Sequence, residues 1–384
     1  MRIFSLLLIF LTSGCVDRID FDIPGNVSLN LVVNGLVSNQ PGPYKIELSS
    51  GFDLDSRLRR QAINAKLVAL YDNVGTYEVL TQGNTGLYFT DANGIRGETG
   101  RVYTLHIELF DGRVYESIPD TLFDGGSLDS VYSNFRQTTL TDSATYGFDI
   151  LFNATTTSKD NFFIQWKFTG TFKVITNPLL SKEEEPCGFP IDCPGCSICN
   201  FAPKCSGYRN IGSPSVNIPP GPIIVERFPC TCCTCWYSIF GDKPLLTSSQ
   251  LVHAGKFNKI VAGYVPVNSW IFQHKVHAEV GQMSLSRQAY DFWRAIKEQQ
   301  NAVNSLFQPV SGRIPSNFVQ LSGTPTPIEG IFYATGISSK FLELTREDVP
   351  RHTFNFPIAD APIGAVCTHL FPNSTTTKPS FWVD

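Results

Sequence analysis

The chain of 384 residues has no excess of basic residues, only 2 methionines, and no apolar run long enough for a membrane helix. Its 30 lysines and arginines are outnumbered by 34 aspartates and glutamates, which gives a net charge of −4. Without a basic excess, we expect no nucleic-acid partner and no electrostatic attachment to an anionic membrane face. Because no stretch reaches the ~18 apolar residues that a spanning helix needs, we also expect no transmembrane helix.

Enzyme signatures are scarce as well. The sequence has no His-Glu-x-x-His helix, no Gly-x-Ser-x-Gly turn, no phosphate-binding loop and no Gly-x-Gly-x-x-Gly. His274 and His277 are three residues apart on an expected strand, which points them to opposite faces. We therefore expect no catalytic residue, no metal site and no cofactor. A glycan hydrolase remains an alternative, because its carboxylate pair is recognised from geometry rather than from sequence.

What the chain has in quantity is glycine, proline and phenylalanine, with 30, 25 and 29 residues. Apolar residues make up 42% and charged residues 17%, which is enough to bury a sizeable core. This composition favours β-structure with many turns. The length indicates two or three domains.

The N-terminus has the pattern of a lipoprotein signal peptide. Residues 3–11 are apolar, follow the positive charge of Arg2, and lead through small residues to Cys15. This resembles a bacterial lipobox, in which the cysteine is acylated and becomes the first mature residue. We expect a signal peptide at 1–14, lipidation of Cys15 and a tether at 15–28. The alternative is an ordinary cleavage site with a chance cysteine.

Residues 29–122 are expected to form an N-terminal β-sandwich. In the clearest stretch, 102–109, apolar and polar side chains alternate, and Asp111-Gly112 supplies the positive φ of a tight hairpin. Turn residues divide the rest into further short strands. Such a series is typical of an Ig-like or transthyretin-like sandwich, and we expect its strands at 29–37, 43–49, 63–71, 77–81, 87–90, 102–109 and 113–117.

A run of turn residues at 119–130 marks the start of a larger C-terminal β-domain, expected over 123–384. A Pro-, Gly- and Cys-rich insertion without periodicity interrupts it at 177–235. One helix is expected at 286–302, where Ala289, Trp293 and Ile296 form an apolar stripe that packs on the sheet, with a partner-binding groove as the alternative. The expected class is all-β, and the strands of this domain are predicted at 146–153, 162–168, 257–265, 270–283, 329–336 and 340–344.

Besides Cys15 the chain has ten cysteines, nine of them within 187–235. Their spacing is similar to that of a zinc or iron–sulfur site, but a signal peptide sends the chain to an oxidising compartment, where disulfides persist. We therefore expect disulfides, with a metal site as the alternative. Nine cysteines cannot all pair among themselves, so full oxidation requires Cys367 to join the cluster, and the adjacent Cys232 and Cys233 should reach different partners. The connectivity stays open among the candidates Cys187, Cys193, Cys196, Cys199, Cys205, Cys230, Cys232, Cys233, Cys235 and Cys367.

Several segments in a fixed order carry a family resemblance: 16–21, 31–35, 97–115, 235–237, 285–293, 306–309 and 378–382. Together they resemble the lipoprotein family catalogued as domain of unknown function 4249. The family's members are outer-membrane lipoproteins, commonly encoded beside TonB-dependent transporters, and no catalytic or ligand-binding residues come with the resemblance. The number of cysteines in the insertion looks unusual for the family, so the role of the insertion transfers least.

The resemblance implies a non-catalytic lipoprotein of the outer membrane that acts as an accessory or substrate-capture subunit of a TonB-dependent transporter. Asp17, Asp20 and Asp22 resemble the export signals of surface-exposed lipoproteins in the Bacteroidota, so we expect the protein to face the cell exterior. A solvated tether is the alternative interpretation of these acids. The rival functions are a secreted surface hydrolase acting on glycan and a structural or adhesive surface protein.

Overall fold

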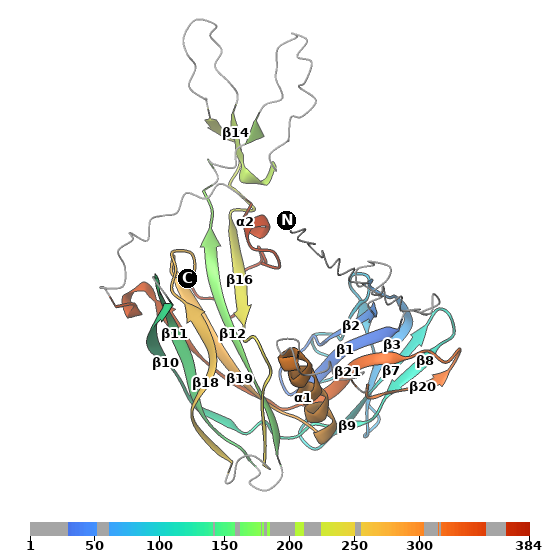
Figure 1. Ribbon diagram of the computed structural model, residues 1–384. Helices are drawn as coiled ribbons and strands as arrows, with labels where there is room; N and C mark the ends of the chain where they lie inside the picture. The colour runs from blue at the N-terminus through green and yellow to red at the C-terminus, as the bar shows by residue number, and fades with distance from the viewer. Residues whose placement is uncertain are drawn as a thin grey trace, which may run out of the picture.

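The computed structural model describes residues 30–51, 61–140, 143–157, 162–177, 179, 183–184, 204–210, 224–249, 255–302, 314, 316–350 and 366–384. The expected signal peptide, Cys15 and the tether lie outside these residues, as do Cys187, Cys193, Cys196 and Cys199. In the described part the fold is all-β with one main helix, which confirms the predicted class (Figure 1). No helix in that part is both long and apolar enough to cross a membrane.

The N-terminal half is a sandwich of two sheets. One sheet has the order β21-β1-β2-β6-β5, and the other has the order β20-β8-β7-β3-β4, with β9 beside β7. The strands expected between 29 and 117 are all present, with ends shifted by at most two residues and 77–81 divided in two. Their bounds are β1 Leu31–Ser38, β2 Lys45–Ser50, β3 Ala65–Asp72, β4 Tyr77–Val79, β5 Thr81–Gln82, β6 Leu87–Phe89, β7 Val102–Leu109, β8 Val114–Ser117 and β9 Asp120–Thr121.

The core of this sandwich follows from the alternation along its strands. Tyr103, Leu105 and Ile107 of β7 are fully buried, and they pack with residues of β1, β2 and β3 in one cluster. Gly112 has a φ of 86° in the hairpin between β7 and β8, as the Asp-Gly pair predicts. Period-2 patterning therefore identified both the strands and the buried face.

A buried aspartate fixes the turn after β3. Asp72 Oδ1 accepts hydrogen bonds from the backbone N–H groups of Val74 at 3.0 Å and Thr76 at 2.8 Å, and Oδ2 pairs with Arg101 at 3.0 Å. Burial alone raises the pKa of this carboxyl, but the bonds from Thr76, Val74 and Arg101 outweigh it and hold the pKa below its usual value. The charged form is thus the form that the fold stabilises.

The sandwich takes two strands from beyond the boundary expected at residue 122. Strand β21, Ile328–Thr335, pairs in parallel with β1, and β20, Phe318–Ser322, pairs antiparallel with β8. At Gly330, where φ is 92°, an added Cβ would lie 1.8 Å from the backbone oxygen of Val33. These strands lie in the expected C-terminal domain, 123–384, yet they complete the sheets of the N-terminal half. The two halves are therefore interleaved along the chain.

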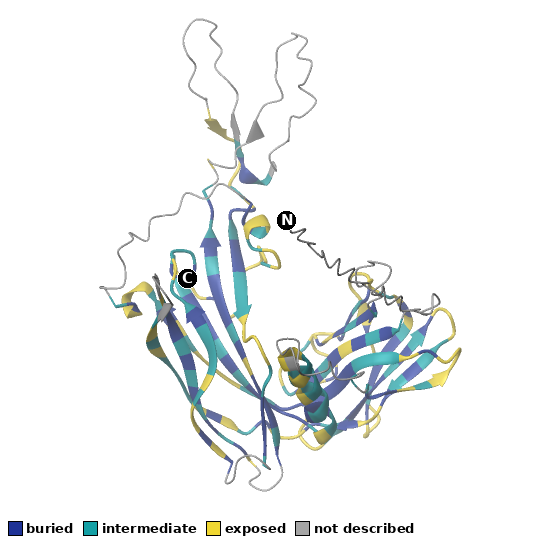
Figure 2. Cartoon of the chain, in the orientation of Figure 1, coloured by how far each residue is buried: buried dark blue, intermediate teal, exposed yellow. Residues whose placement is uncertain are grey.

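The C-terminal half pairs a three-stranded sheet with a five-stranded sheet. The first has the order β10-β11-β18, and the second has the order β16-β12-β19-β22, with β17 beside β12. Phe152, Trp166, Phe172 and Val280 lie in the core between them, and Figure 2 shows the buried residues along β12 and β19. The bounds are β10 Ser127–Leu140, β11 Ser143–Thr155, β12 Phe163–Ile175, β16 Thr234–Phe240, β17 Leu245–Ser248, β18 Lys256–Pro266, β19 Lys275–Ser284 and β22 Ile337–Thr345.

Strand β19 is shorter than the stretch expected at 270–283. The carboxamide oxygen of Asn268 accepts hydrogen bonds from the backbone N–H groups of Trp270 at 3.0 Å and Ile271 at 2.9 Å. This closes a turn, so residues 270–274 are not in the strand. The prediction for these five residues was wrong because an apolar run alone does not distinguish a turn from a strand.

Helix α1, Arg287–Ala302, lies where the two halves meet, and the halves diverge from there (Figure 1). The hydroxyl oxygen of Ser286 accepts a hydrogen bond from the backbone N–H of Ala289 at 3.2 Å, as an N-cap does. Ala289 and Tyr290 are buried in a cluster that includes Tyr333 of β21, and Phe163 of β12 packs against it. The helix therefore packs on sheets of both halves, as the stripe predicts.

The described part of the insertion contains regular structure that no periodicity predicts. It forms a small sheet of β13, Glu183–Glu184, β14, Tyr208–Asn210, and β15, Ile224–Glu226, beyond the end of β12 (Figure 1). The remaining elements are the 3-10 turns η3, Lys204–Ser206, and η4, Arg346–Asp348, and the short helix α2, Cys367–Leu370.

Candidate functional site

The candidate functional site is a pocket between the two halves of the molecule. Its volume is about 560 Å³, which is in the range of small-molecule sites. Residues 119–130 connect the two halves and are called the link. The wall of the pocket combines the link, the residues after β11, the start of β12 and the first turn of α1. The lining residues are Pro119, Asp120, Thr121, Phe123, Asp124, Gly125, Gly126, Thr156, Thr157, Phe162, Phe163, Ile164, Ser284, Leu285, Ser286, Arg287 and Gln288.

Asp120 of β9 is the buried acid of this wall. Its Oδ2 accepts a hydrogen bond from the backbone N–H of Ala334 at 2.8 Å, and the Ser286 side chain is a further hydrogen-bond partner. Burial raises the pKa of the Asp120 carboxyl, and these hydrogen bonds oppose the rise without reversing it. The side chain ties β9 to β21 and to the start of α1.

Buried hydrogen bonds also hold the link between the halves. The hydroxyl of Ser284 donates to the carbonyl oxygen of Phe123 at 2.6 Å and accepts from the backbone N–H of Gly336 at 3.0 Å. The amide of Gln282 donates to the carbonyl oxygen of Gly125 at 2.6 Å. Because side chains of β19 hold the middle of this link at Phe123 and Gly125, the pocket wall is formed before any ligand binds.

The mouth of the pocket is more polar than its interior. Phe162 and Leu285 are buried, whereas Phe123 is 49% exposed and Arg287 and Asp124 are exposed. An apolar interior with a few polar groups fits a ligand that has an apolar body and a charged or hydrogen-bonding end.

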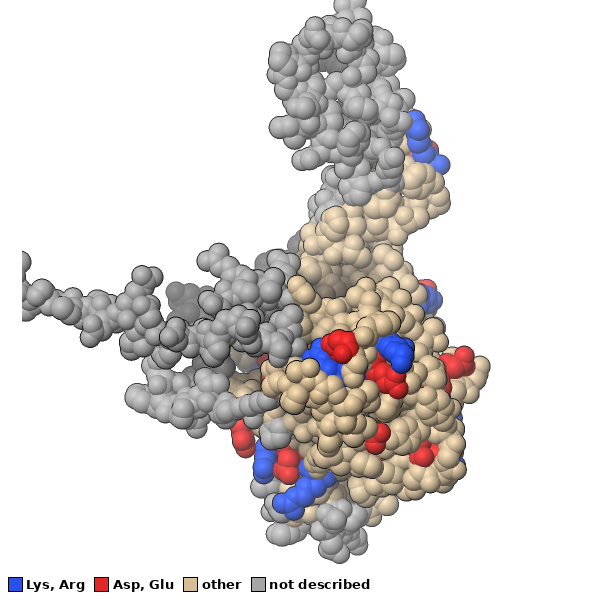
Figure 3. Space-filling model, turned by 90° about the vertical axis from the view of Figure 1, so that its right-hand side faces the viewer, with Lys and Arg blue, Asp and Glu red and all other residues tan. Residues whose placement is uncertain are grey.

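On the face drawn in Figure 3, the described residues show no large field of one sign. This part is mostly uncharged, and acidic and basic side chains lie close together in small groups. Among the ion pairs of the N-terminal sandwich, Lys66 lies 3.0 Å from Glu108 and Arg113 lies 2.7 Å from Asp111. Surface pairs of this kind contribute little to stability.

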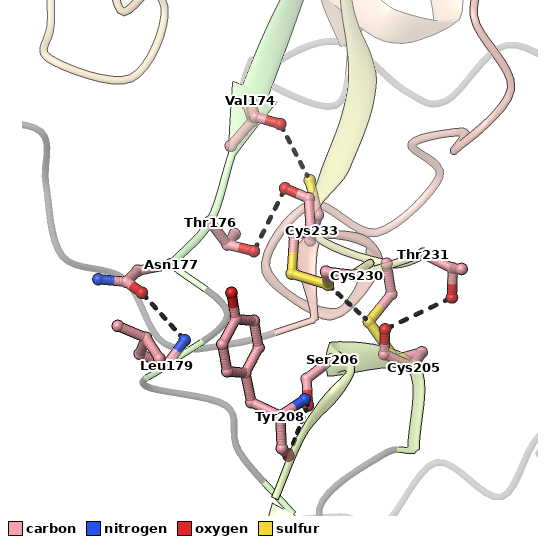
Figure 4. Close-up of a disulfide and its surroundings, with 12 residues drawn as sticks. Val174, Thr176, Asn177, Leu179, Cys205, Ser206, Tyr208, Cys230, Thr231 and Cys233 are labelled. Carbon is pink, nitrogen blue, oxygen red and sulfur yellow. Dashed lines mark hydrogen bonds between the residues drawn. A yellow bond between two sulfur atoms is a disulfide. The ribbon is translucent and has the colours of Figure 1, made fainter. Parts of the chain in front are cut away.

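Three disulfides join six of the candidate cysteines. They are Cys205–Cys232, Cys230–Cys233 and Cys235–Cys367. Cys367, at the start of α2, is bonded to β16, and the adjacent Cys232 and Cys233 have different partners. The first two bridges lie side by side between β12 and the small sheet (Figure 4). The other four candidates lie outside the described residues.

The two histidines three residues apart, His274 and His277, lie in different surroundings. His274 is exposed and precedes β19, whereas His277 is in β19, between the rings of Phe341 and Phe381, each centred 4.5 Å away. Burial lowers the pKa of His277, which favours the neutral ring. Within the described residues, the only convergent set of at least three metal-ligand side chains is Cys230, Cys232 and Cys233.

Sequence reasoning missed the pocket, although its residues carry a signal. The link at 119–130 was recognised by its turn residues and interpreted only as a boundary. Phe123 is atypical for a solvated linker because it is a large aromatic residue, whereas nothing in the sequence marks Asp120, which only the fold buries. The partners that complete the wall come from β19 and α1, more than 150 positions away in the chain.

Fold and site define a two-part β-protein with a pocket between its parts and a disulfide-braced insertion. The chain matches the family described as "Domain of unknown function (DUF4249)" over residues 16–340. Because this match covers most of the chain, the protein belongs to that family, which confirms the resemblance. No curated protein and no solved structure matches the chain.

Proposed function

We propose that this protein is a non-catalytic lipoprotein of the outer membrane that captures a substrate for a TonB-dependent transporter. Cys15 carries the lipid anchor, and the folded part faces the cell exterior. The association with a transporter comes from the family resemblance. The pocket between the halves carries the capture step.

The pocket supports capture because of its composition and its place. Its interior is largely apolar with the buried Asp120 in its wall, its mouth has Arg287 and Asp124, and its wall belongs to both halves. A bound molecule contacts β12, the link and α1 at once, so it is enclosed by elements that the fold already holds in place. A small molecule with an apolar body and one anionic end suits the exposed arginine at the mouth.

A fluorescent probe tests the pocket. We expect the amphipathic anion 1-anilinonaphthalene-8-sulfonate to bind at one site, and Phe123→Glu at the mouth to weaken binding at least about 10-fold, because it replaces an apolar contact with a negative charge that repels the probe. The matched control is Phe110→Glu, because Phe110 is 74% exposed and does not line the pocket. Equal binding by the two variants would remove the pocket from the account.

Purification of the lipidated full chain in mild detergent tests the partnership. Mass spectrometry of the co-purifying proteins is expected to identify a TonB-dependent transporter in stoichiometric amount. Recovery of the chain without any transporter contradicts the proposal and favours the structural or adhesive alternative.

A specific observation favours one second candidate, a glycan hydrolase. Asp120 and Asp124 both line the pocket, and burial raises the pKa of Asp120, as in a general acid. Each carboxyl also accepts a backbone hydrogen bond. Asp120 accepts from the N–H of Ala334 at 2.8 Å, and Asp124 accepts from the N–H of Gly126 at 3.0 Å. The hydrolase is established instead if the wild-type protein cleaves a member of a glycan panel, and if Asp120→Asn abolishes this turnover while the variant still binds the probe.

A further inference from the structure

We propose that Cys205, Cys230, Cys232 and Cys233 form a second site, which binds one zinc ion when their two disulfides are reduced. We call this set the four-sulfur cluster. The oxidised cluster is a pair of bridges, and the reduced cluster is a tetrahedral set of thiolates. The inference does not depend on the pocket or on a transporter.

The positions of the sulfur atoms carry the inference. The Sγ atoms of Cys230 and Cys232 belong to different bridges and are 3.9 Å apart. The Sγ atoms of Cys230, Cys232 and Cys233 all lie within 4.8 Å of one another. In a tetrahedral zinc site with Zn–S bonds of about 2.3 Å, the sulfurs are about 3.8 Å apart. The unbonded pair Cys230–Cys232 therefore already has the spacing of a zinc tetrahedron, and each bonded pair has to open by less than about 2 Å. The Sγ atom of Cys205 is bonded to Cys232 but lies outside the convergent set, so it has to move toward Cys230 and Cys233 to complete the tetrahedron.

Backbone hydrogen bonds hold the cluster independently of its sulfurs. The N–H of Thr176, at the end of β12, donates to the carbonyl oxygen of Cys233 at 2.8 Å, and the N–H of Cys367 donates to that of Cys232 at 3.0 Å. The N–H of Thr231 donates to the carbonyl oxygen of Cys205 at 2.9 Å, which joins the two arms of the cluster. Reduction removes none of these bonds, so the four thiols stay close together.

The surroundings suit a structural metal site. Cys232 is 7% and Cys233 is 6% exposed, whereas Cys205 and Cys230 are half-buried. A reductant thus has access to one sulfur of each bridge, and the inner sulfurs are shielded from competing water. Four thiolates also match the ligand preference of zinc, which structural sites close with four protein ligands.

The chemistry balances in two steps. A small dithiol gives each bridge two electrons and two protons, which yields four cysteine thiols and two molecules of the cyclic disulfide of the reductant. One Zn²⁺ then binds the four sulfurs and displaces their four protons. Two molecules of a small disulfide reverse the change: they take four electrons from the thiolates, leave as four thiols with four protons from water, restore both bridges and release Zn²⁺. Zinc binding at the base of the insertion therefore depends on the redox state.

Metal titration of the full mature chain tests the site. After reduction with a dithiol and its removal under nitrogen, we expect one equivalent of Co²⁺ to give the absorption of tetrahedral thiolate coordination and Zn²⁺ to displace it. X-ray absorption at the zinc edge should show four sulfurs at about 2.3 Å. The oxidised protein should bind neither ion.

Three variants locate the ion. Cys205→Ser should weaken zinc binding by more than about 100-fold, because it removes a ligand rather than an outer partner. Cys235→Ala with Cys367→Ala removes the third bridge and should leave the affinity unchanged. The third variant carries serine in place of Cys187, Cys193, Cys196 and Cys199 together, and it should also bind zinc with unchanged affinity. Fewer than four sulfurs around zinc, full affinity in C205S, or loss of binding in the last variant would each overturn the proposal.

Discussion

Gln282 holds the link to the sheets of the C-terminal half, and its replacement gives the sharpest prediction for the fold. This side chain of β19 is fully buried. Its amide nitrogen donates to the carbonyl oxygens of Gly125 at 2.6 Å and Thr155 at 3.3 Å, and its oxygen accepts from the indole N–H of Trp166 at 2.9 Å. The three bonds connect the link, β11 and β12 at the pocket wall.

Gln282→Leu keeps the volume and leaves these three polar groups without their partner. Each buried group that loses its hydrogen bond costs about 1–3 kcal/mol, and water from the pocket reaches only part of the site, so we expect a loss of about 3 kcal/mol. The measurement is the free energy of unfolding from urea titration, read as a lower midpoint at an unchanged slope.

A matched control lies on the neighbouring strand. Gln165 of β12 is 3% exposed, and its side-chain oxygen is buried without a hydrogen-bond partner. Gln165→Leu is the same substitution at similar burial, so it should cost less than about 1 kcal/mol or increase stability. If Q282L and Q165L lose the same free energy, the hydrogen bonds of Gln282 do not stabilise the link against the C-terminal sheets and the reasoning is refuted.

Three further predictions concern the rest of the fold. The double variant C235A/C367A should lower the free energy of unfolding by about 3–5 kcal/mol, because the bridge joins positions 132 residues apart; no change in urea titration would show that the bridge does not restrain the unfolded chain. Gly330→Ala should cost at least about 2 kcal/mol more than Gly75→Ala, since both glycines have positive φ but only Gly330 has a backbone oxygen where the Cβ would lie. Equal losses of stability would contradict this. Asp72→Asn should reduce stability at neutral pH. The pKa of Asp72 is lowered by folding, so its contribution is complete above the unfolded pKa near 4 and is lost as the pH falls through the folded pKa. Unfolding curves of both proteins should therefore converge in acid, and a constant difference would be evidence against this role.

Local sequence patterns were sufficient to predict most strands and the main helix of the described fold. Strand β7 was predicted with the ends that it has, and α1 begins one residue after the expected start, because alternation, caps and turn residues act over a few positions. The parallel pairing of β1 with β21 was not predictable in this way. Its partners are about 300 positions apart, and no local pattern indicates which distant strand completes a sheet.

The candidate site was harder to predict for the same reason. Cysteine parity required Cys367 to join the cluster, but it did not identify Cys235 as its partner. Asp120 and Ser284 each look ordinary in the sequence. Only the fold brings them to one pocket, since β9 and the end of β19 are not neighbours along the chain.

Lipidation of Cys15 is the claim on which the cellular role depends most directly. Metabolic labelling with a fatty acid, followed by membrane fractionation, measures it. The account predicts label on the wild-type chain in the outer-membrane fraction and none on Cys15→Ser. An unlabelled wild-type chain in the cytosolic fraction would contradict the anchor and, with it, the transporter partnership.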